Sequence, residues 1–434
     1  MDKMADVLGR AGAWCGQNKY LSAIKNAFQN FMPLTIAGAI GVLWCNVLVN
    51  ETTGLGMFFK PIMALDFLNP AFQAVNFCTI SCITVGITLG IAQEIGVWNM
   101  GAERAGYIPG LVGLAAWLSV TNTSHMVDGA KEAFTGIAGN ELGATGLFTG
   151  MIIGVLSVEL FCFFEKQDAL KIKMPEQVPP GVARAFEVLV PATITLIITA
   201  CIGSACYNLT GLYLNDVIKN GIQGPLGAVG ATIPGVMIIY LVIMLFWLVG
   251  IHGNNMLSAV KEALFTPLAL ENVEAFNKHQ TPKNIINMYA LQMWGEFGGS
   301  GVTIGLVIAI MIFGKREDNK AIATLSLVPG LFNINETVTF GIPMVLNPIL
   351  GIPFVFACLV TILVGYVLTV IGFCPVACLT VPWTCPPIVF GFLACGANVM
   401  GAVTQAILIV VSTVIYTPFL ISYEKYQNKQ AAEA

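Results

Sequence analysis

Charged residues are scarce in this chain of 434 residues. Asp, Glu, Lys and Arg together make up only 10% of it, whereas hydrophobic residues make up 56%, and the mean hydropathy is +0.79. A soluble globular chain carries roughly 25% charged residues. This shortage excludes a cytosolic enzyme, a disordered scaffold and a secreted disulfide module. The composition instead predicts an all-α polytopic membrane protein surrounded by lipid.

The features of several binding classes are also lacking. The formal net charge is −4, so no clustered basic surface for nucleic acid is expected. Most cysteines lie inside apolar runs, where a free cysteine behaves as a small hydrophobe. Cys374 and Cys378 have no His or carboxylate beside them, so a metal is not expected there. No other cofactor is expected. Lys19 and Lys25 interrupt the N-terminal segment, which predicts an amphipathic cytoplasmic lead-in over 1–27 rather than a signal peptide.

Long apolar runs fill most of the chain. A bilayer core of roughly 30 Å requires about 20 helical residues. The stretches that come near this length are 28–49, 71–92, 105–121, 144–164, 185–207, 231–251, 285–313, 321–345, 351–371, 376–395 and 399–421. We expect 28–230 to form an N-terminal scaffold and dimerisation region. We expect 231–422 to bind and translocate a substrate, and 423–434 to form a cytoplasmic tail.

Lysine and arginine are distributed unevenly among the loops. They gather in the N-terminal lead-in and in 165–184, and they are sparse in 50–70 and 122–143. Because positive charge stays on the cytoplasmic side, the N-terminus and 165–184 are expected inside and the other two loops outside. The lysines of the C-terminal tail place it inside too. Two cytoplasmic termini require an even number of crossings, so at least one of the stretches above does not cross.

Two stretches in the second half are interrupted by residues that break helices. GGSG at 298–301 interrupts 285–313. The breaks in 321–345 are Pro329, Gly330, Gly341 and Pro343. Non-helical backbone at membrane depth survives only where it is buried in protein or lines a cavity, and such discontinuous segments point to transport sites. The substrate site is therefore predicted in the second half.

Polar residues inside these apolar stretches are the candidates for the site. His252 ends an apolar run in FWLVGIHGNN, Glu296 lies in MWGEFGGSG, and Asn333, Asn335 and Glu336 cluster in LFNINETVTFGIP. An Asp or basic residue at membrane depth costs at least about 2.5–3.5 kcal/mol on insertion scales, so such ionisable groups are functional candidates by default. Two other interpretations stay open. His252 can be a satisfied core or loop histidine, and Glu296 can be structural.

Two tryptophans and one arginine complete the set of candidates. Trp247 lies five residues before His252, and Trp383 lies in the proline-flanked segment CLTVPWTCPP. An indole can pack against the apolar face of a sugar ring, but interfacial tryptophans are also common anchors. Arg104 is a further sugar-binding candidate, although a charge pair with Glu103 at the membrane surface is the favoured explanation for it.

These motifs form an ordered series. They are GIHG around His252, GGSG at 298–301, PGLFNINE at 329–336, FGIPMVLNP at 340–348, VPWTCPP at 381–387 and YTPFL at 416–420. In this series the chain resembles the membrane permease subunit, enzyme IIC (EIIC), of the sugar phosphotransferase system, in the lactose, cellobiose and chitobiose family. The resemblance implies a homodimer with about ten transmembrane helices per subunit and two re-entrant hairpins in the C-terminal half.

The resemblance also implies a function. A β-linked disaccharide of the cellobiose, chitobiose or lactose type is carried across the bacterial cell membrane and phosphorylated on its 6-hydroxyl. The donor is a phosphocysteine on a separate EIIB, which works with EIIA, so the chain would be the membrane component of a protein-phosphocysteine–sugar phosphotransferase. His252 and Glu336 match the residues that contact this hydroxyl in the family. Glu336 is then expected to act as general base, with His252 fixing the same hydroxyl.

The remaining candidates take supporting roles under this resemblance. Trp383 and, less directly, Trp247 match the buried aromatic residues of the family, and Asn333 and Asn335 are expected to orient either the loop or the sugar. Two residues depart from the usual pattern: Thr337 replaces the proline of NINEP, and Glu296 stands where a neutral residue is usual. Both bear on the identity of the sugar more than on the mechanism.

Two other functions stay open at this point. In a proton-coupled secondary sugar transporter, Glu336 or Glu296 would carry the coupling proton. In a non-catalytic sensor or facilitator, Glu336 would be dispensable for sugar flux.

Overall fold

The computed structural model describes residues 10, 14, 17–51, 56, 58–125, 134–175, 177–225, 230–342 and 344–433. Most of the lead-in, part of the 122–143 loop and Pro343 therefore lie outside the described residues. The contacts of the chain divide it into two compact units. The N-terminal unit is built from residues 17–41 and 70–227, and the C-terminal unit mainly from residues 42–69 and 228–434.

Among the described residues of the N-terminal unit, the regular structure is helical apart from one short ribbon of two antiparallel strands, β1 (Ser124–His125) and β2 (Phe134–Thr135). Its helices are α2 (Lys19–Leu43), α3 (Asn69–Asn76), α4 (Ile83–Met100), α5 (Ala102–Ala105), α6 (Ile108–Val120), α7 (Gly139–Leu142), α8 (Ala144–Glu165), α9 (Pro180–Thr210) and α10 (Leu214–Ile218). Pro109 and Pro180 lie in the first turns of α6 and α9, where a missing N–H costs nothing. Gly211 ends α9 in the left-handed conformation.

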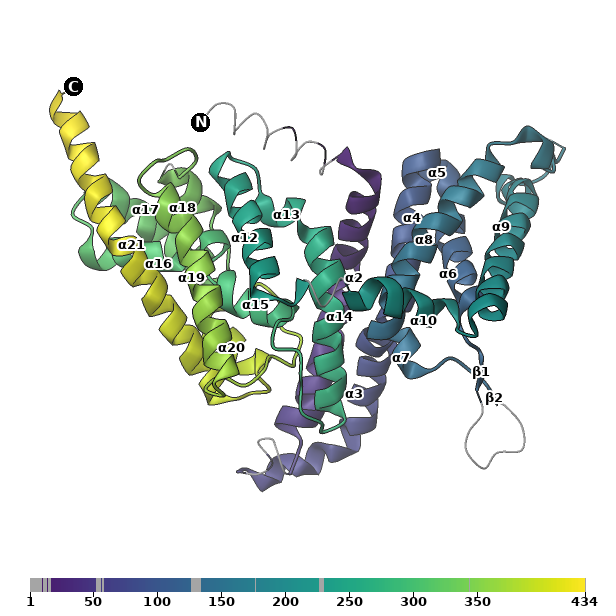
Figure 1. Ribbon diagram of the computed structural model, residues 1–434, viewed down its shortest axis with the longest axis horizontal. Helices are drawn as coiled ribbons and strands as arrows, with labels where there is room; N and C mark the ends of the chain where they lie inside the picture. Colours follow the sequence, from purple (N-terminus) through teal and green to yellow (C-terminus); the bar gives the residue numbers. More distant parts are fainter. Residues whose placement is uncertain are drawn as a thin grey trace. The chain divides into compact units, whose positions relative to one another are not determined.

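Small residues bring the helices of this unit close together. α4 packs against α6 and α8, and α6 packs against α9 (Figure 1). A Cβ atom added at Gly113 would collide with Ala92, and one added at Gly150 would collide with Thr88. Helices in lipid associate through such close packing, because lipid tails are as apolar as the helix surfaces and the hydrophobic effect does not drive the helices together.

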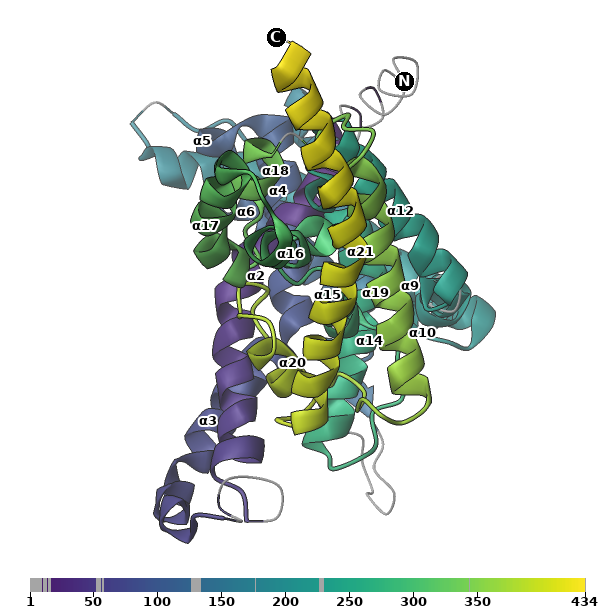
Figure 2. The same cartoon turned by 90° about the vertical axis from the view of Figure 1, so that its left-hand side faces the viewer.

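The C-terminal unit contains the predicted site segments. Its helices are α12 (Ile233–Leu248), α13 (Gly253–Met256), α14 (Ser258–Asn277), α15 (Met288–Gly295), α16 (Ile304–Phe313), α17 (Glu317–Leu331), α18 (Glu336–Gly341), α19 (Gly351–Val370), α20 (Val389–Ala394) and α21 (Val399–Glu433). α21, the yellow helix of Figures 1 and 2, runs along α16 and α19, and α19 packs against α12 and α15.

The interruption at GGSG is present, with a bend of 60° between the segment Met288–Val302 and α16. Gly298, Gly299 and Gly301 have φ values of 68°, 87° and 75°, which favour glycine. The carbonyl groups that the break frees have partners: Tyr416 Oη donates to Gly301 O at 2.8 Å, and Ser412 Oγ donates to Val302 O at 2.9 Å. Side chains of α21 thus satisfy non-helical backbone at membrane depth.

Two stretches differ from the expectation. The candidate span 376–395 is mostly irregular, and only α20 within it is helical, because the prolines of VPWTCPP remove helical hydrogen bonds. In contrast, the stretch 252–284, which is absent from the candidate spans, contains the 20-residue helix α14. Lys261 on this helix is buried.

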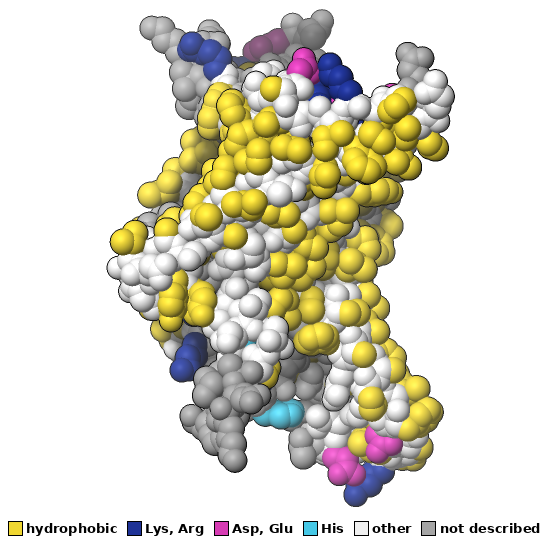
Figure 3. All heavy atoms as spheres, turned by 90° about the vertical axis from the view of Figure 1, so that its right-hand side faces the viewer, with side chains coloured by type: hydrophobic (Ala, Val, Ile, Leu, Met, Phe, Trp, Pro, Cys, Tyr) yellow, Lys and Arg dark blue, Asp and Glu magenta, His cyan; other side chains and the backbone are white. Residues whose placement is uncertain are grey.

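Lipid is the natural surrounding of this fold. Among the described residues, five helices are long and apolar enough to cross a membrane, or seven if each of two bent pairs counts as one span. Figure 3 shows hydrophobic side chains over the middle of one face and charged side chains at its two ends. The chain is therefore a polytopic α-helical membrane protein, and ten spans per subunit stays a prediction.

Candidate functional site

His252 lies in the break between α12 and α13. The chain leaves α12 through Gly250, whose φ is 81°, and His252 becomes the N-cap residue of α13. Its Nδ1 accepts a hydrogen bond from the backbone N–H of Asn255 at 3.3 Å. In a neutral imidazole the proton then sits on Nε2, which is left as a donor.

Glu336 begins α18, directly after the NINE break. Its Oε1 lies 3.8 Å from His252 Nε2, and the two side chains are 46% and 39% exposed. This separation is too long for a direct hydrogen bond. A single hydroxyl group can bridge the two atoms, because its oxygen can accept from Nε2–H while its proton is donated to the carboxylate. The geometry thus suits one alcohol group of a ligand.

Asn333 ties three interrupted segments together. Its φ of 62° places it in the left-handed region, which asparagine tolerates. Its Oδ1 accepts from the N–H of Gly298 at 2.6 Å, and its Nδ2 donates to the carbonyls of Trp383 and Cys385 at 2.5 and 3.1 Å. Both donors and the acceptor of the amide are therefore engaged by backbone. Of the two roles expected for Asn333, this geometry favours orienting the loop.

Asn335 belongs to a second set of polar contacts, centred on Ser300 in the GGSG break. The buried Asn335 donates from Nδ2 to Ser300 O at 2.8 Å. Asn254, two residues after His252, donates from Nδ2 to Ser300 Oγ at 2.9 Å. Ser300 therefore links the segment that carries His252 to the segment that carries Glu336. Sequence analysis did not identify Ser300 or Asn254.

A buried ion pair continues this set of contacts. Lys261 Nζ on α14 pairs with Glu296 Oε1, and it lies 3.5 Å from Asn254 Oδ1. The same Oε1 accepts a hydrogen bond of 2.7 Å from Tyr240 Oη. The side chains of Lys261 and Glu296 are only 7% and 17% exposed. Sequence analysis identified Glu296 but not Lys261. The signal available in the sequence was a lysine close to the apolar stretch 263–270.

The two tryptophans have different surroundings. The Trp247 ring centroid lies 4.4 Å from that of His252 and 6.5 Å from that of Phe354. Trp247 is only 2% exposed, so it supports the imidazole and leaves little of either face free in this conformation. Trp383 is 45% exposed, and its backbone is held by Asn333. Its indole therefore has free surface on which a ring can pack.

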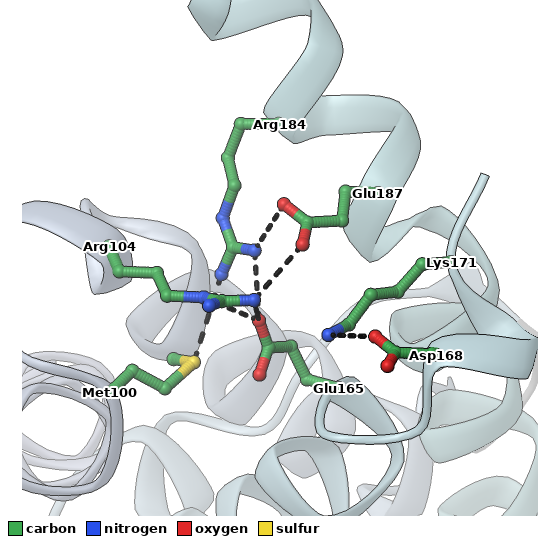
Figure 4. A network of polar contacts seen from close by, with 7 residues as sticks. All are labelled: Met100, Arg104, Glu165, Asp168, Lys171, Arg184 and Glu187. Atoms are coloured by element: carbon green, nitrogen blue, oxygen red, sulfur yellow. Dashed lines mark hydrogen bonds and ion pairs between the residues drawn. The ribbon is translucent and has the colours of Figure 1, made fainter. Parts of the chain in front are cut away.

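Arg104 lies in the N-terminal unit and has carboxylate partners there. Figure 4 shows Arg104 and Arg184 converging on Glu165 and Glu187. Arg104 Nη2 lies 2.8 Å from Glu165 Oε1 and 3.0 Å from Glu187 Oε1, so its partners are these residues and not the neighbouring Glu103. Glu165 is 3% exposed and also pairs with Arg184 at 2.9 Å. This geometry favours a structural role for Arg104.

The described parts of the chain contain no cluster of side chains that could bind a metal ion. No group of three or more His, Cys, Asp or Glu side chains among those residues is arranged to hold an ion. The polar groups around His252 and Glu336 are amides, hydroxyls and one ion pair, which are the partners expected for a hydroxyl-rich ligand.

Comparisons with known proteins agree on one family. The family model described as "Phosphotransferase system, EIIC" matches residues 25–358. The oligo-beta-mannoside-specific EIIC component of Bacillus subtilis is 32% identical over 429 residues, which cover 98% of this chain and 94% of that protein. The cellobiose-specific EIIC component of Lactococcus lactis is 28% identical over 486 aligned residues, with 98% of each protein covered.

A solved structure agrees with these relatives. The crystal structure of ChbC, the IIC component from the N,N'-diacetylchitobiose-specific phosphotransferase system, superimposes with a TM-score of 0.88 at 29% sequence identity. The superposition covers 97% of each chain.

Proposed function

Since the chain belongs to the EIIC family of the phosphotransferase system, we propose that it imports a β-linked disaccharide and presents the 6-hydroxyl of that sugar to a phosphorylated EIIB. The observation that carries this proposal is the 3.8 Å separation between His252 Nε2 and Glu336 Oε1. At this spacing, His252 can donate a hydrogen bond to the oxygen of one hydroxyl while Glu336 accepts a hydrogen bond from the same hydroxyl.

In the proposed reaction this chain forms no covalent bond to the substrate; it positions the acceptor hydroxyl and takes its proton. Phosphoryl transfer requires an acceptor oxygen in line with the bond that breaks, and a group that takes its proton. Glu336 accepts the proton of the 6-hydroxyl as general base, while His252 Nε2–H holds the same oxygen. The oxygen attacks the phosphorus of a phosphocysteine on EIIB, the phosphorus–sulfur bond breaks, and the cysteine leaves as a thiolate.

Release of the product follows from its charge. The phosphorylated sugar carries negative charge that the unmodified sugar lacks, and charge is poorly accommodated at membrane depth. The product therefore leaves towards water on the side where the phosphoryl donor binds and does not return. Movement of the site between the two sides is expected to occur as a block.

The substrate class is inferred from the named relatives and from Trp383. The relatives above are named for cellobiose, oligo-beta-mannoside and N,N'-diacetylchitobiose, all of which contain β-linked sugars. The half-exposed indole of Trp383 offers a surface for one sugar ring. We propose that Asn333 and Asn335 position the loop, and that Trp247 supports His252.

Orientation and assembly are also proposals. The bias of lysine and arginine supports cytoplasmic N- and C-termini in a bacterial cell membrane. We propose that 28–230 serves as scaffold in a homodimer and 231–422 as the translocating region. Exposed apolar side chains on α9, such as Leu189, Ile197 and Ile202, are available to lipid or to a second copy.

Uptake into sealed vesicles tests this function. Labelled cellobiose is supplied outside vesicles that contain the protein, with phosphorylated EIIB inside. We expect phosphorylated sugar to accumulate only when the phosphorylated EIIB is present. Accumulation of unmodified sugar under a pH gradient, without EIIB, would instead identify a proton-coupled transporter.

A further inference from the structure

The buried ion pair of Lys261 and Glu296 has a cost that folding alone does not explain. Both side chains are largely removed from solvent, and taking two charges out of water is expensive even when they are paired. Apolar residues of similar size are often at least as stabilising in such a position. An ionisable pair kept inside a membrane protein is a functional candidate by default.

The hydrogen bonds leave one oxygen of Glu296 free. Lys261 Nζ and Tyr240 Oη both bind Oε1. Oε2 accepts no hydrogen bond from any residue that the structure describes, and the side chain keeps 17% of its surface exposed. Lys261 neutralises the charge of the carboxylate and, with Tyr240, fixes its orientation. The result is a preorganised acceptor.

This acceptor belongs to the same part of the C-terminal unit as His252. Lys261 contacts Asn254, which binds Ser300, which in turn is held by Asn335 next to Glu336. Through its ion pair with Lys261, Glu296 is therefore linked by side-chain contacts to the segments that carry His252 and Glu336, although it lies on a different segment of backbone.

We propose that Glu296 is a sugar-binding residue whose free Oε2 accepts a hydrogen bond from the 2-hydroxyl of one sugar ring, and that Lys261 is the positioning residue that holds it. This inference rests on the proposed function, because it names a second contact to the same disaccharide. It assigns to Glu296 a part in choosing the sugar, whereas His252 and Glu336 act on the reacting hydroxyl.

The chemistry of a carboxylate gives this choice a direction. An ionised carboxylate only accepts hydrogen bonds, so it favours ring positions that carry donors. A 2-acetamido group keeps an N–H donor, but it is larger than the hydroxyl it replaces and brings a carbonyl oxygen that the carboxylate repels. The chain should therefore prefer cellobiose to N,N'-diacetylchitobiose. A glutamine at position 296 can donate to the acetamido carbonyl, so it should relax this preference.

The first test measures binding of both disaccharides to the purified full-length protein in detergent. Glu296→Gln should lower the ratio of cellobiose affinity to diacetylchitobiose affinity by about tenfold, the size of one hydrogen bond to a charged group. Lys261→Arg keeps the positive charge and should keep most of the wild-type ratio. Glu274→Gln on the exposed face of α14, where Glu274 pairs with Lys278, is the matched control and should change nothing.

Loss of the pair can impair folding, so a neutral double variant and a second measurement accompany these variants. Lys261→Met/Glu296→Gln removes both charges together and should show the same relaxed ratio as Glu296→Gln. On the wild-type protein, a series of cellobiose analogues that each lack one hydroxyl should show that loss of one 2-hydroxyl, besides loss of the 6-hydroxyl, lowers affinity by about tenfold or more. The effect of losing the 2-hydroxyl should disappear in the double variant.

Three results would decide the matter. An unchanged sugar ratio in both Glu296 variants overturns the role of Glu296, as does a deoxy series in which only C6 is important. If removal of the 6-hydroxyl still weakens binding in that case, the proposed function stands without this inference. Wild-type protein that binds neither sugar would reject both.

Discussion

His252 and Glu336 come together from distant parts of the chain because each lies where a helix is interrupted. His252 caps α13 after the turn at Gly250, and Glu336 opens α18 after the left-handed residue Asn333. The two atoms that face each other, His252 Nε2 and Glu336 Oε1, make no hydrogen bond to other residues that the structure describes. The separation of 3.8 Å leaves room for a hydroxyl to bridge them, which a helix without breaks would not provide.

Replacing the carboxylate of Glu336 should separate binding from chemistry. In Glu336→Gln we expect phosphorylation of the sugar by EIIB to fall by about 10²–10⁴-fold, the usual contribution of a general base. Sugar binding should fall much less, because the amide oxygen still accepts a hydrogen bond. Phosphorylated sugar formed per unit time, measured beside equilibrium binding, checks this.

The matched control for that variant is Glu317→Gln on α17, whose side chain is 88% exposed and pairs with Lys320. It should phosphorylate sugar at the wild-type rate. Equal losses of binding and phosphorylation in Glu336→Gln would mean that the residue holds the sugar without acting as a base.

At the scale of elements, the site depends on interrupted segments held to one another by side-chain amides. The single side chain of Asn333 connects the GGSG break and the VPWTCPP segment to the interrupted segment that carries Glu336. Tyr416 and Ser412 of α21 satisfy the carbonyls at 301 and 302. These contacts explain how backbone without helical hydrogen bonds is retained within a membrane.

Removing the Asn333 side chain should destabilise the C-terminal unit. Asn333→Ala deletes three hydrogen bonds and leaves their backbone partners unsatisfied, at a cost of about 2–4 kcal/mol. Thermal unfolding of the purified protein should shift to lower temperature. Asn208→Ala is the control, since Asn208 is exposed on α9 and makes a single long contact with Ser204; an equal shift in both variants would contradict the role of Asn333.

The ion pair of Lys261 and Glu296 should behave as a coupled unit. Lys261→Met leaves an unpaired carboxylate in a buried position, which is expected to cost about 3–5 kcal/mol. The double variant Lys261→Met/Glu296→Gln should recover most of that loss, because no charge remains unpaired. A thermal-unfolding cycle over the wild type, both single variants and the double variant measures the coupling. Additive losses would show that the two residues act independently.

The breaks could be predicted from sequence, whereas the supporting contacts could not. Glycine and proline mark an interruption by their own backbone chemistry, so GGSG and the prolines of VPWTCPP were visible. α14 was not among the candidate spans. The partner that makes a buried Lys261 tolerable, Glu296, lies on another segment. Long-range pairs of this kind leave no local pattern. For the same reason, Glu296 was visible as a polar residue in an apolar run, but its free oxygen was not.

At the scale of the whole molecule, the chain is a membrane protein in which charge is confined to few places. The buried charges of the N-terminal unit include Glu165, which is held by Arg104 and Arg184. Those of the C-terminal unit include Lys261 with Glu296. Pairing inside each unit removes the penalty of isolated charge at depth, and many large hydrophobic side chains are left exposed.

Orientation can be tested on the intact chain. We expect both termini to face the cytoplasm, because lysine and arginine gather in the lead-in, in 165–184 and in the tail. A reporter fluorescent only in the cytoplasm should fluoresce when fused to the C-terminus. A reporter active only outside should be active when inserted in the 122–143 loop. The reverse pattern for both reporters would invert the proposed direction of transport.

The central claim is that one hydroxyl of the cargo binds both His252 and Glu336. The most direct measurement is the affinity of the purified protein for cellobiose and for its 6-deoxy analogue, in the wild type and in Glu336→Ala. We predict that the wild type binds the analogue about tenfold or more weakly than cellobiose, since a hydrogen bond to a charged group is lost. In Glu336→Ala most of that difference should vanish. An equal difference in both proteins would show that the 6-hydroxyl binds elsewhere and would contradict the account.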